Sequence, residues 1–343
     1  MNNERIVQFE LLRIFAMFGV VMNHVFNYGL LIYDDFRVDA STISGFLVWS
    51  ILELMKLMSL PSVNCYILIS GYFLIEKTQF RLKGMWVVWS TTWFYAVSIY
   101  ILAVATGIVP FSWNELRIHA TPLLSNSYWF VTSYIILLFL APFLSWILQK
   151  LSKRQYQIAL VLGGIACFQL LLGQFIMDDQ QVLLFVYLFM IGGYIRRYVD
   201  HASSGFYALL CSIGLLMLMY AYTLFKNDPL HNSCFAVYAM EYHGLILPLS
   251  VAIFIFVKHW RINHQTFRKC ILTIAPLSFA VYIIHTQSIV DKWLWATASQ
   301  WLGSCSIYWL PFACILIALL VFVICVLIEF LRTLAIRWKM GGN

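Results

Sequence analysis

The stretch FELLRIFAMFGVVMNHV, residues 9–25, is apolar enough for a membrane-spanning helix, yet it carries Glu10, Arg13 and His24. Each of these ionisable side chains is costly in hydrocarbon. Glu10 and Arg13 are three residues apart and therefore neighbours on one helical face. His24 follows Arg13 by about three turns, which places it on the same face roughly 16 Å further along. A polar stripe on a membrane helix is expected to face protein or water rather than lipid.

The composition of the whole chain agrees with a membrane protein. Of its 343 residues, 62% are hydrophobic and 11% are charged, whereas soluble proteins carry about 25% charged residues. We therefore predict an all-α, polytopic membrane helix bundle that forms a single domain over residues 1–343. The first span is expected to be retained rather than cleaved as a signal peptide, because no small-residue cleavage site follows it.

Apolar runs of about 20 residues, the length that crosses the hydrocarbon core, occur about ten times. Residues 44–55, ahead of Pro61, are expected to form a separate interfacial helix. The predicted spans lie near 6–29, 56–75, 85–107, 127–148, 157–176, 181–195, 205–225, 237–257, 271–290 and 305–330.

Lys and Arg residues are divided unequally between the two sets of loops. If the N-terminus is cytoplasmic, sixteen lie in inner loops and tails, whereas only Arg37, Arg117, Lys226 and Lys292 lie in outer loops. Cytoplasmic loops of membrane proteins carry such an excess. We expect both termini to be cytoplasmic and the chain to lie in the cell (inner) membrane. The formal charge of +7 then reflects topology and not nucleic-acid binding.

The eight cysteines contain no C-x-x-C pair and no metal-ligand spacing, so no metal site is expected. Most lie in or beside apolar runs, where Cys acts as a small hydrophobe. Cys234 and Cys305 fall in predicted outer loops and could form a disulfide, although their spacing does not require one.

A second histidine lies in the segment APLSFAVYIIHTQS, residues 275–288. Ser278, Tyr282 and His285 share one helical face at i, i+4 and i+7. By the predicted topology His285 and His24 lie at similar depth in the outer half of the membrane. Imidazole titrates near neutral pH, so both are candidates for general base chemistry. The sequence leaves open that either one only packs in the bundle, and that Arg13 only pairs with Glu10.

Five segments, in order along the chain, resemble the acyltransferase-3 family. Arg13 and His24 match its R-x10-H signature. The other matches are LISGYFL (68–74) with the basic FRLKGMW (80–86), SYWFVTSYIILLFLAPFL (127–144), FMIGGYIRRY (189–198) and SFAVYIIH (278–285). Glu10 stands where many members have Asp.

The resemblance implies a bacterial membrane O-acyltransferase. Such proteins move an acyl group, usually acetyl, from cytoplasmic acyl-CoA to a sugar hydroxyl of a surface polysaccharide or its lipid-linked precursor. Arg13, Arg81 and Lys83 would hold the acetyl-CoA phosphates through charge-assisted bonds. His24, with His285 as a second catalytic candidate, would take the proton of the acceptor hydroxyl. No Ser or Cys nucleophile with a partnered base stands out, so direct transfer is favoured over an acyl-enzyme.

Several further residues are candidates for substrate binding. The aromatic ones could line a sugar or acyl pocket, but aromatic residues at span ends also anchor helices at the membrane interface. The candidates are Glu10, Tyr72, Trp129, Phe130 and Tyr282.

Two other function classes stay open from the sequence. The first is a transporter or flippase of a lipid-linked saccharide, with Arg13 contacting the pyrophosphate, and the second is a non-catalytic assembly subunit. No internal repeat is evident, which weighs against inverted-repeat transporters. Hydrolysis or transfer from acetyl-CoA would separate an acyltransferase from both.

Overall fold

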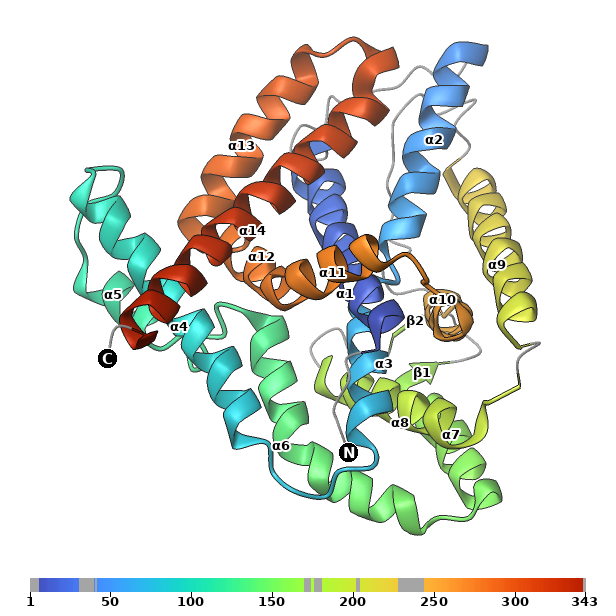
Figure 1. Cartoon of the computed structure of the whole chain (residues 1–343). Helices are drawn as coiled ribbons and strands as arrows, with labels where there is room; N and C mark the ends of the chain where they lie inside the picture. The colour runs from blue at the N-terminus through green and yellow to red at the C-terminus, as the bar shows by residue number, and fades with distance from the viewer. Residues whose placement is uncertain are drawn as a thin grey trace.

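A computed structural model of the chain describes residues 6–30, 40, 42–169, 174–175, 181–201, 204–227 and 244–341. This part is built almost entirely of helices (Figure 1). The strands within it are β1 (Phe168–Gln169) and β2 (Gln174–Phe175), which pair antiparallel over two residues each. The predicted all-α class is therefore confirmed.

The helical elements are α1 (Val7–His24), the π-helix η1 (Val25–Leu30), α2 (Ile43–Ser59), α3 (Ser62–Leu74), α4 (Leu82–Ala105), α5 (Trp113–Ala120), α6 (Trp129–Lys150), α7 (Lys153–Cys167), α8 (Gln181–Tyr198), α9 (Ser204–Asn227), α10 (Ile246–His259), α11 (Gln265–Ile274), the 3-10 turn η3 (Ala275–Leu277), α12 (Ser278–His285), α13 (Ser288–Ser304), the 3-10 turn η4 (Ile307–Trp309) and α14 (Leu310–Gly341).

Within the described residues, seven helical stretches are long and apolar enough to cross a membrane. They are Val7–Leu30, Ile43–Leu74, Leu82–Ala105, Trp129–Lys150, Ser204–Phe225, Gln265–His285 and Ile307–Trp338. The membrane character predicted from composition is thus supported. The count of ten spans and the cytoplasmic termini stay predictions, since α7, α8 and α10 fall at predicted spans but outside these seven.

The predicted interfacial helix ends, and the second span begins, at other residues than expected. Helix α2 does not end at residue 55 but continues to Ser59, and α3 follows after Leu60 and Pro61. Leu60 and Pro61 keep right-handed helical dihedral angles. Proline has no N–H to donate and therefore interrupts the hydrogen-bond ladder at this point. The result is one nearly continuous helical path with an interruption beside the candidate site.

Two other spans differ at their ends. The predicted span 271–290 is divided into α11, η3 and α12, with Pro276 at the interruption, and its helix ends at His285. Helix α14 extends eleven residues beyond the predicted 330, to Gly341. Cys234 lies outside the described residues, so its possible disulfide with Cys305 stays a prediction.

Helix α1 is the centre of the bundle. It packs against α2, α3, α10, α11, α12 and α14, and Figure 1 shows it surrounded by them. The Phe9 ring on α1 stacks on Phe254 of α10 and also contacts Tyr72 of α3. Because most of its neighbours are helices far away in sequence, the polar stripe of α1 faces protein.

Helices α3 and α8 approach each other more closely than ordinary side chains allow. A methyl group on Gly71 would collide with the backbone of Phe189, and one on Gly192 would collide with the carbonyl oxygen of Leu68. Small residues at helix interfaces in membranes permit such backbone contact. The glycines of LISGYFL and FMIGGY therefore fix how α3, which lines the candidate site, is seated in the bundle.

Candidate active site

A first cavity, here called the histidine chamber, lies beside the last turns of α1. It holds about 530 Å³ of empty space, including space open to solvent, between α1, the α2–α3 junction, α6 and α12. Its lining is largely apolar and aromatic with a few polar groups, as in most small-molecule sites. It is lined by Met17, Val20, Asn23, His24, Ser59, Leu60, Ser62, Val63, Tyr66, Trp129, Phe130 and Tyr282.

A second cavity, here called the arginine chamber, lies nearer the beginning of α1 and holds about 1020 Å³ of empty space, including space open to solvent. Arg13 and Arg81 both line it, although they come from α1 and from the residue before α4. Hydroxyl groups add polar contacts: Ser70 Oγ lies 3.1 Å from the Tyr134 hydroxyl. The chamber thus combines two guanidinium groups with hydrogen-bonding side chains.

The two chambers adjoin each other at Tyr66 and Phe130, which line both. The rings of these residues meet edge to face with centroids 6.3 Å apart. The Tyr66 hydroxyl lies 3.0 Å from Ser278 Oγ, which also lines the arginine chamber. Arg13 and His24 consequently line two neighbouring cavities along α1 that share two aromatic side chains in their walls.

The two candidate histidines are in direct contact. The rings of His24 and His285 meet edge to face, with centroids 4.9 Å apart. His285 Nδ1 donates to the Val281 carbonyl at 2.5 Å, because a carbonyl oxygen can only accept. Among the described residues, no hydrogen-bond partner reaches the buried atoms His24 Nδ1 and His285 Nε2. Each ring of the pair therefore keeps one nitrogen without a hydrogen bond to any described residue, and His24 is the one of the two that lines the chamber.

A tryptophan on α13 contacts both rings of the histidine pair. The Trp295 ring on α13 lies 6.1 Å from that of His24 and 6.3 Å from that of His285, between centroids. Its indole N–H donates to Asp291 Oδ1 at 2.9 Å, which fixes the ring. The site is therefore walled by side chains whose orientation is set by their own hydrogen bonds.

Arg13 makes two kinds of contact at once. Its Nη1 lies 2.9 Å from Glu10 Oε1, and its side chain also lines the arginine chamber. The Arg13 side chain is about one-third exposed, whereas Glu10 is buried. Both roles that the sequence left open for Arg13, pairing with Glu10 and facing an anion, are compatible with this geometry.

A comparison with known protein families identifies the family of this chain. A family model described as an acyltransferase domain, that of acyltransferase-3, matches residues 6–329 of the 343. The chain belongs to the acyltransferase-3 family. No curated protein and no solved structure was found to match it. The family resemblance predicted from the motifs is thereby confirmed, and with it a membrane acyltransferase in general.

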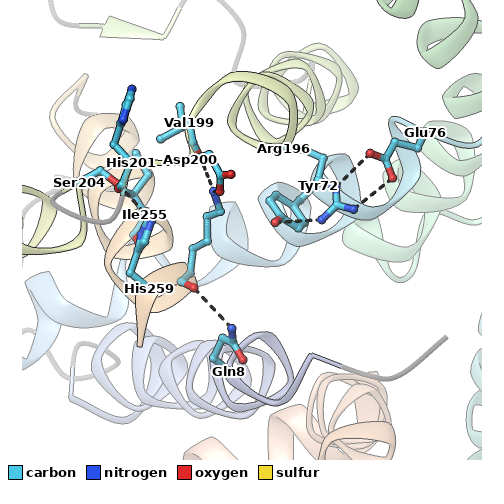
Figure 2. Close-up of polar contacts among 11 residues, drawn as sticks. Gln8, Tyr72, Glu76, Arg196, Val199, Asp200, His201, Ser204, Ile255 and His259 are labelled. Atoms are coloured by element: carbon cyan, nitrogen blue, oxygen red, sulfur yellow. Dashed lines mark hydrogen bonds and ion pairs between the residues drawn. The ribbon is translucent and has the colours of Figure 1, made fainter. Parts of the chain in front are cut away.

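In this acyltransferase-3 chain, three of the predicted aromatic residues line the histidine chamber: Trp129, Phe130 and Tyr282. Tyr72 lies elsewhere. Figure 2 shows its hydroxyl directed at Arg196, whose Nη1 donates to it at 3.2 Å. The same guanidinium pairs with Glu76 at 3.1 Å. Tyr72 thus belongs to a network that ties α3 to α8 and lines neither chamber.

The three residues predicted to bind the acyl donor, Arg13, Arg81 and Lys83, do not all line the same cavity. Arg81 lines the arginine chamber, but Lys83 lines an apolar groove with Trp86 and Trp89 on another side of α4. Arg13 and Arg81 are therefore the predicted cations that the fold brings together. Within the described residues, no cluster of three or more His, Cys, Asp or Glu side chains is arranged to hold a metal ion.

The structure also places in the site a polar pair that the sequence analysis did not single out. Lys56 of α2 is 3% exposed, and its Nζ donates to Asn23 Oδ1 at 2.6 Å. It also donates to Asn27 Oδ1. A signal was present, because Glu53 and Lys56 stand three residues apart in an apolar stretch, just as Glu10 and Arg13 do. The predicted boundary at residue 55 placed Glu53 in the interfacial helix and Lys56 in the next span, whereas both lie on α2.

Proposed function

We propose that this acyltransferase moves an acyl group, foremost acetyl, from cytoplasmic acyl-CoA to a sugar hydroxyl of a cell-surface polysaccharide or its lipid-linked precursor. One observation carries the proposal: Arg13 and His24 line adjoining chambers that share Tyr66 and Phe130. Acetyl-CoA has an anionic nucleotide at one end and a reactive thioester at the end of a narrow arm. A molecule of this shape suits two adjoining chambers.

The arginine chamber suits the nucleotide end of acetyl-CoA. Guanidinium groups bind phosphate oxygens in a bidentate manner, and Arg13 and Arg81 face one cavity. The pantetheine arm would then run along α1, past Tyr66 and Phe130, over the roughly 16 Å that separate eleven residues of helix. This arrangement brings the thioester to the histidine chamber.

The histidine chamber suits the transfer itself. The acceptor hydroxyl oxygen attacks the thioester carbonyl carbon while His24 takes the hydroxyl proton. The bond from carbon to sulfur then breaks, and the leaving thiolate takes up the proton from His24. The products are the O-acylated sugar and CoA. Trp129 and Tyr282 offer aromatic surfaces for the acceptor, whose ring carries apolar faces and polar edges.

The proposed location is the cell (inner) membrane, with the Arg13 end of α1 toward the cytoplasm, where acyl-CoA is made. The excess of Lys and Arg in the predicted inner loops supports this orientation. An acceptor in or near the outer leaflet would then approach His24 from the other side, and membrane lipid surrounds the bundle.

The test is turnover of acetyl-CoA by the full chain purified in detergent. We expect wild-type protein to release CoA thiol in the presence of polysaccharide extracted from a strain lacking the gene, and to place acetyl on that polysaccharide. His24→Ala should do neither, while the exposed His201→Ala serves as the matched histidine control. A transporter or an assembly subunit would release no CoA, so an inactive wild type would overturn the proposal.

A further inference from the structure

We infer that Asn23 donates the hydrogen bond that stabilises the oxyanion of the acyl transfer, and that Lys56 is a positioning residue that fixes the Asn23 amide. The inference rests on the proposed function. It concerns Asn23, which is one of the unspecified positions of the R-x10-H signature, and Lys56, which lies outside all of the matched segments.

The orientation of the Asn23 amide follows from its partner. Lys56 Nζ lies 2.6 Å from the Asn23 side chain. An ammonium group can only donate, so the atom facing it must be the amide oxygen Oδ1. The amide nitrogen Nδ2 is therefore turned away from Lys56. Among the described residues, no acceptor binds this Nδ2 atom.

The Asn23 side chain lines the histidine chamber together with His24, the next residue in the chain. A proton acceptor and a hydrogen-bond donor thus reach one cavity from a single turn of α1. Lys56 is almost fully buried, and hydrogen bonds in such surroundings polarise one another. Withdrawal of electron density from Oδ1 by the ammonium group makes the N–H groups of Nδ2 stronger donors.

The chemistry of the transfer requires a donor at this place. When the acceptor oxygen forms its bond to the thioester carbon, the carbonyl electron pair moves to the carbonyl oxygen, which becomes an anion. That pair returns when the bond to sulfur breaks and the thiolate leaves. A hydrogen bond aimed at the developing anion typically contributes 10²–10³-fold to the rate constant of the chemical step.

A simpler reading is that Lys56 only ties α2 to α1. Asn27 provides the matched control, because it also accepts a hydrogen bond from Lys56 but does not line the histidine chamber. The variants are Asn23→Ala, Asn23→Asp and Asn27→Ala, with Lys56→Met and its conservative partner Lys56→Arg. Each is purified in detergent and compared for kcat, for the KM of acetyl-CoA and for Tm.

We expect Asn23→Ala to lower kcat by roughly 10²–10³-fold with the KM of acetyl-CoA changed less than about threefold. Asn23→Asp keeps an oxygen for Lys56 but replaces the donor with an acceptor, so it should lose as much kcat while retaining its Tm. Asn27→Ala should keep kcat within about fivefold. Lys56→Met should lower kcat and Lys56→Arg should restore part of it.

Two results separate this inference from the proposed function. A wild type that releases no CoA would overturn both. An active wild type with an equally active Asn23→Asp variant would overturn the oxyanion role alone, as would equal losses of kcat in the Asn23→Ala and Asn27→Ala variants. If Asn23→Ala proves too unstable to purify, the Asn23→Asp comparison decides the outcome by itself.

Discussion

The rings of His24 and His285 meet edge to face with centroids 4.9 Å apart, although the residues lie on α1 and α12. His24 lines the histidine chamber, whereas His285 is fully buried behind it and does not. Its Nδ1 atom is held by the Val281 carbonyl. The contact suggests unequal roles, with His24 acting on the substrate and His285 holding the His24 ring in place.

His24→Ala should therefore abolish transfer while leaving acetyl-CoA binding intact, since loss of a positioned general base typically costs 10²–10⁴-fold. His285→Ala should cost less, because His285 touches the base and not the chamber. The measurements are kcat for acetyl-CoA turnover and, separately, the Kd of acetyl-CoA. Near wild-type turnover of His24→Ala would remove His24 from the mechanism.

The helical period explains which parts of the site the sequence predicted. Arg13 and His24 share a face of α1, and Ser278, Tyr282 and His285 share a face of α12. Of these five, all but the fully buried His285 line a chamber. Contacts between distant helices carry no such period. Three features of the site therefore appear only in the folded chain. They are the hydrogen bond from Lys56 to Asn23, the position of Tyr66 in the lining of both chambers, and the contact of the Trp295 ring with His24.

The glycines between α3 and α8 provide a test of the packing that seats α3. Gly71→Ala and Gly192→Ala each place a methyl group against backbone atoms of the other helix. Overpacking of this kind costs about 1–3 kcal/mol, so Tm should fall in both variants. Gly214→Ala on α9 is the control, because nothing lies within 4 Å of the added methyl. A Tm that falls as far in Gly214→Ala would contradict the packing argument.

Acidification should destabilise the region around α5 through His119. The ring is buried and stacks on Tyr100 at 4.9 Å between centroids. Burial lowers the pKa of His119, and the Glu115 carboxylate partly opposes this effect. The unfolded chain, with a histidine pKa near 6.5, then binds a proton more readily than the folded chain. Stability is complete above about pH 6.5 and is lost as the pH falls below it.

The corresponding measurement is Tm between pH 7.5 and pH 5 in buffers of constant ionic strength. His119→Phe keeps a stacked ring without a titratable group, so its Tm should fall less over this range than that of the wild type. Glu115→Gln removes the opposing carboxylate and should make the fall larger. Identical profiles for wild type and His119→Phe would show that His119 contributes nothing to the pH dependence.

The orientation in the membrane can be tested with single cysteines in a background without cysteine. Asp178, in the predicted outer loop after the fifth span, lies outside the described residues, so Ser125 in the loop before α6 is the better outer site. Ser152, between α6 and α7, is the inner site, and both residues are exposed. An impermeant thiol reagent on intact cells should label the cysteine at Ser125 only. Labelling of both positions would contradict cytoplasmic termini.

The last prediction separates the two contacts of Arg13. If Arg13 holds the donor phosphates, Arg13→Ala should weaken acetyl-CoA binding by about 2–5 kcal/mol. Arg13→Lys should recover part of the binding, because lysine carries the charge but not the planar fork. If Arg13 instead only neutralises buried Glu10, its removal leaves an unpaired carboxylate that destabilises the fold.

The double variant Arg13→Ala with Glu10→Gln distinguishes these cases, because it removes both charges together. Under the donor-binding role the double variant should regain its Tm while the Kd for acetyl-CoA stays weak. Recovery of both Tm and activity would assign Arg13 to helix packing and leave the phosphates to Arg81, the other guanidinium that lines the arginine chamber. We expect the first result, since the Arg13 side chain faces that chamber while it pairs with Glu10.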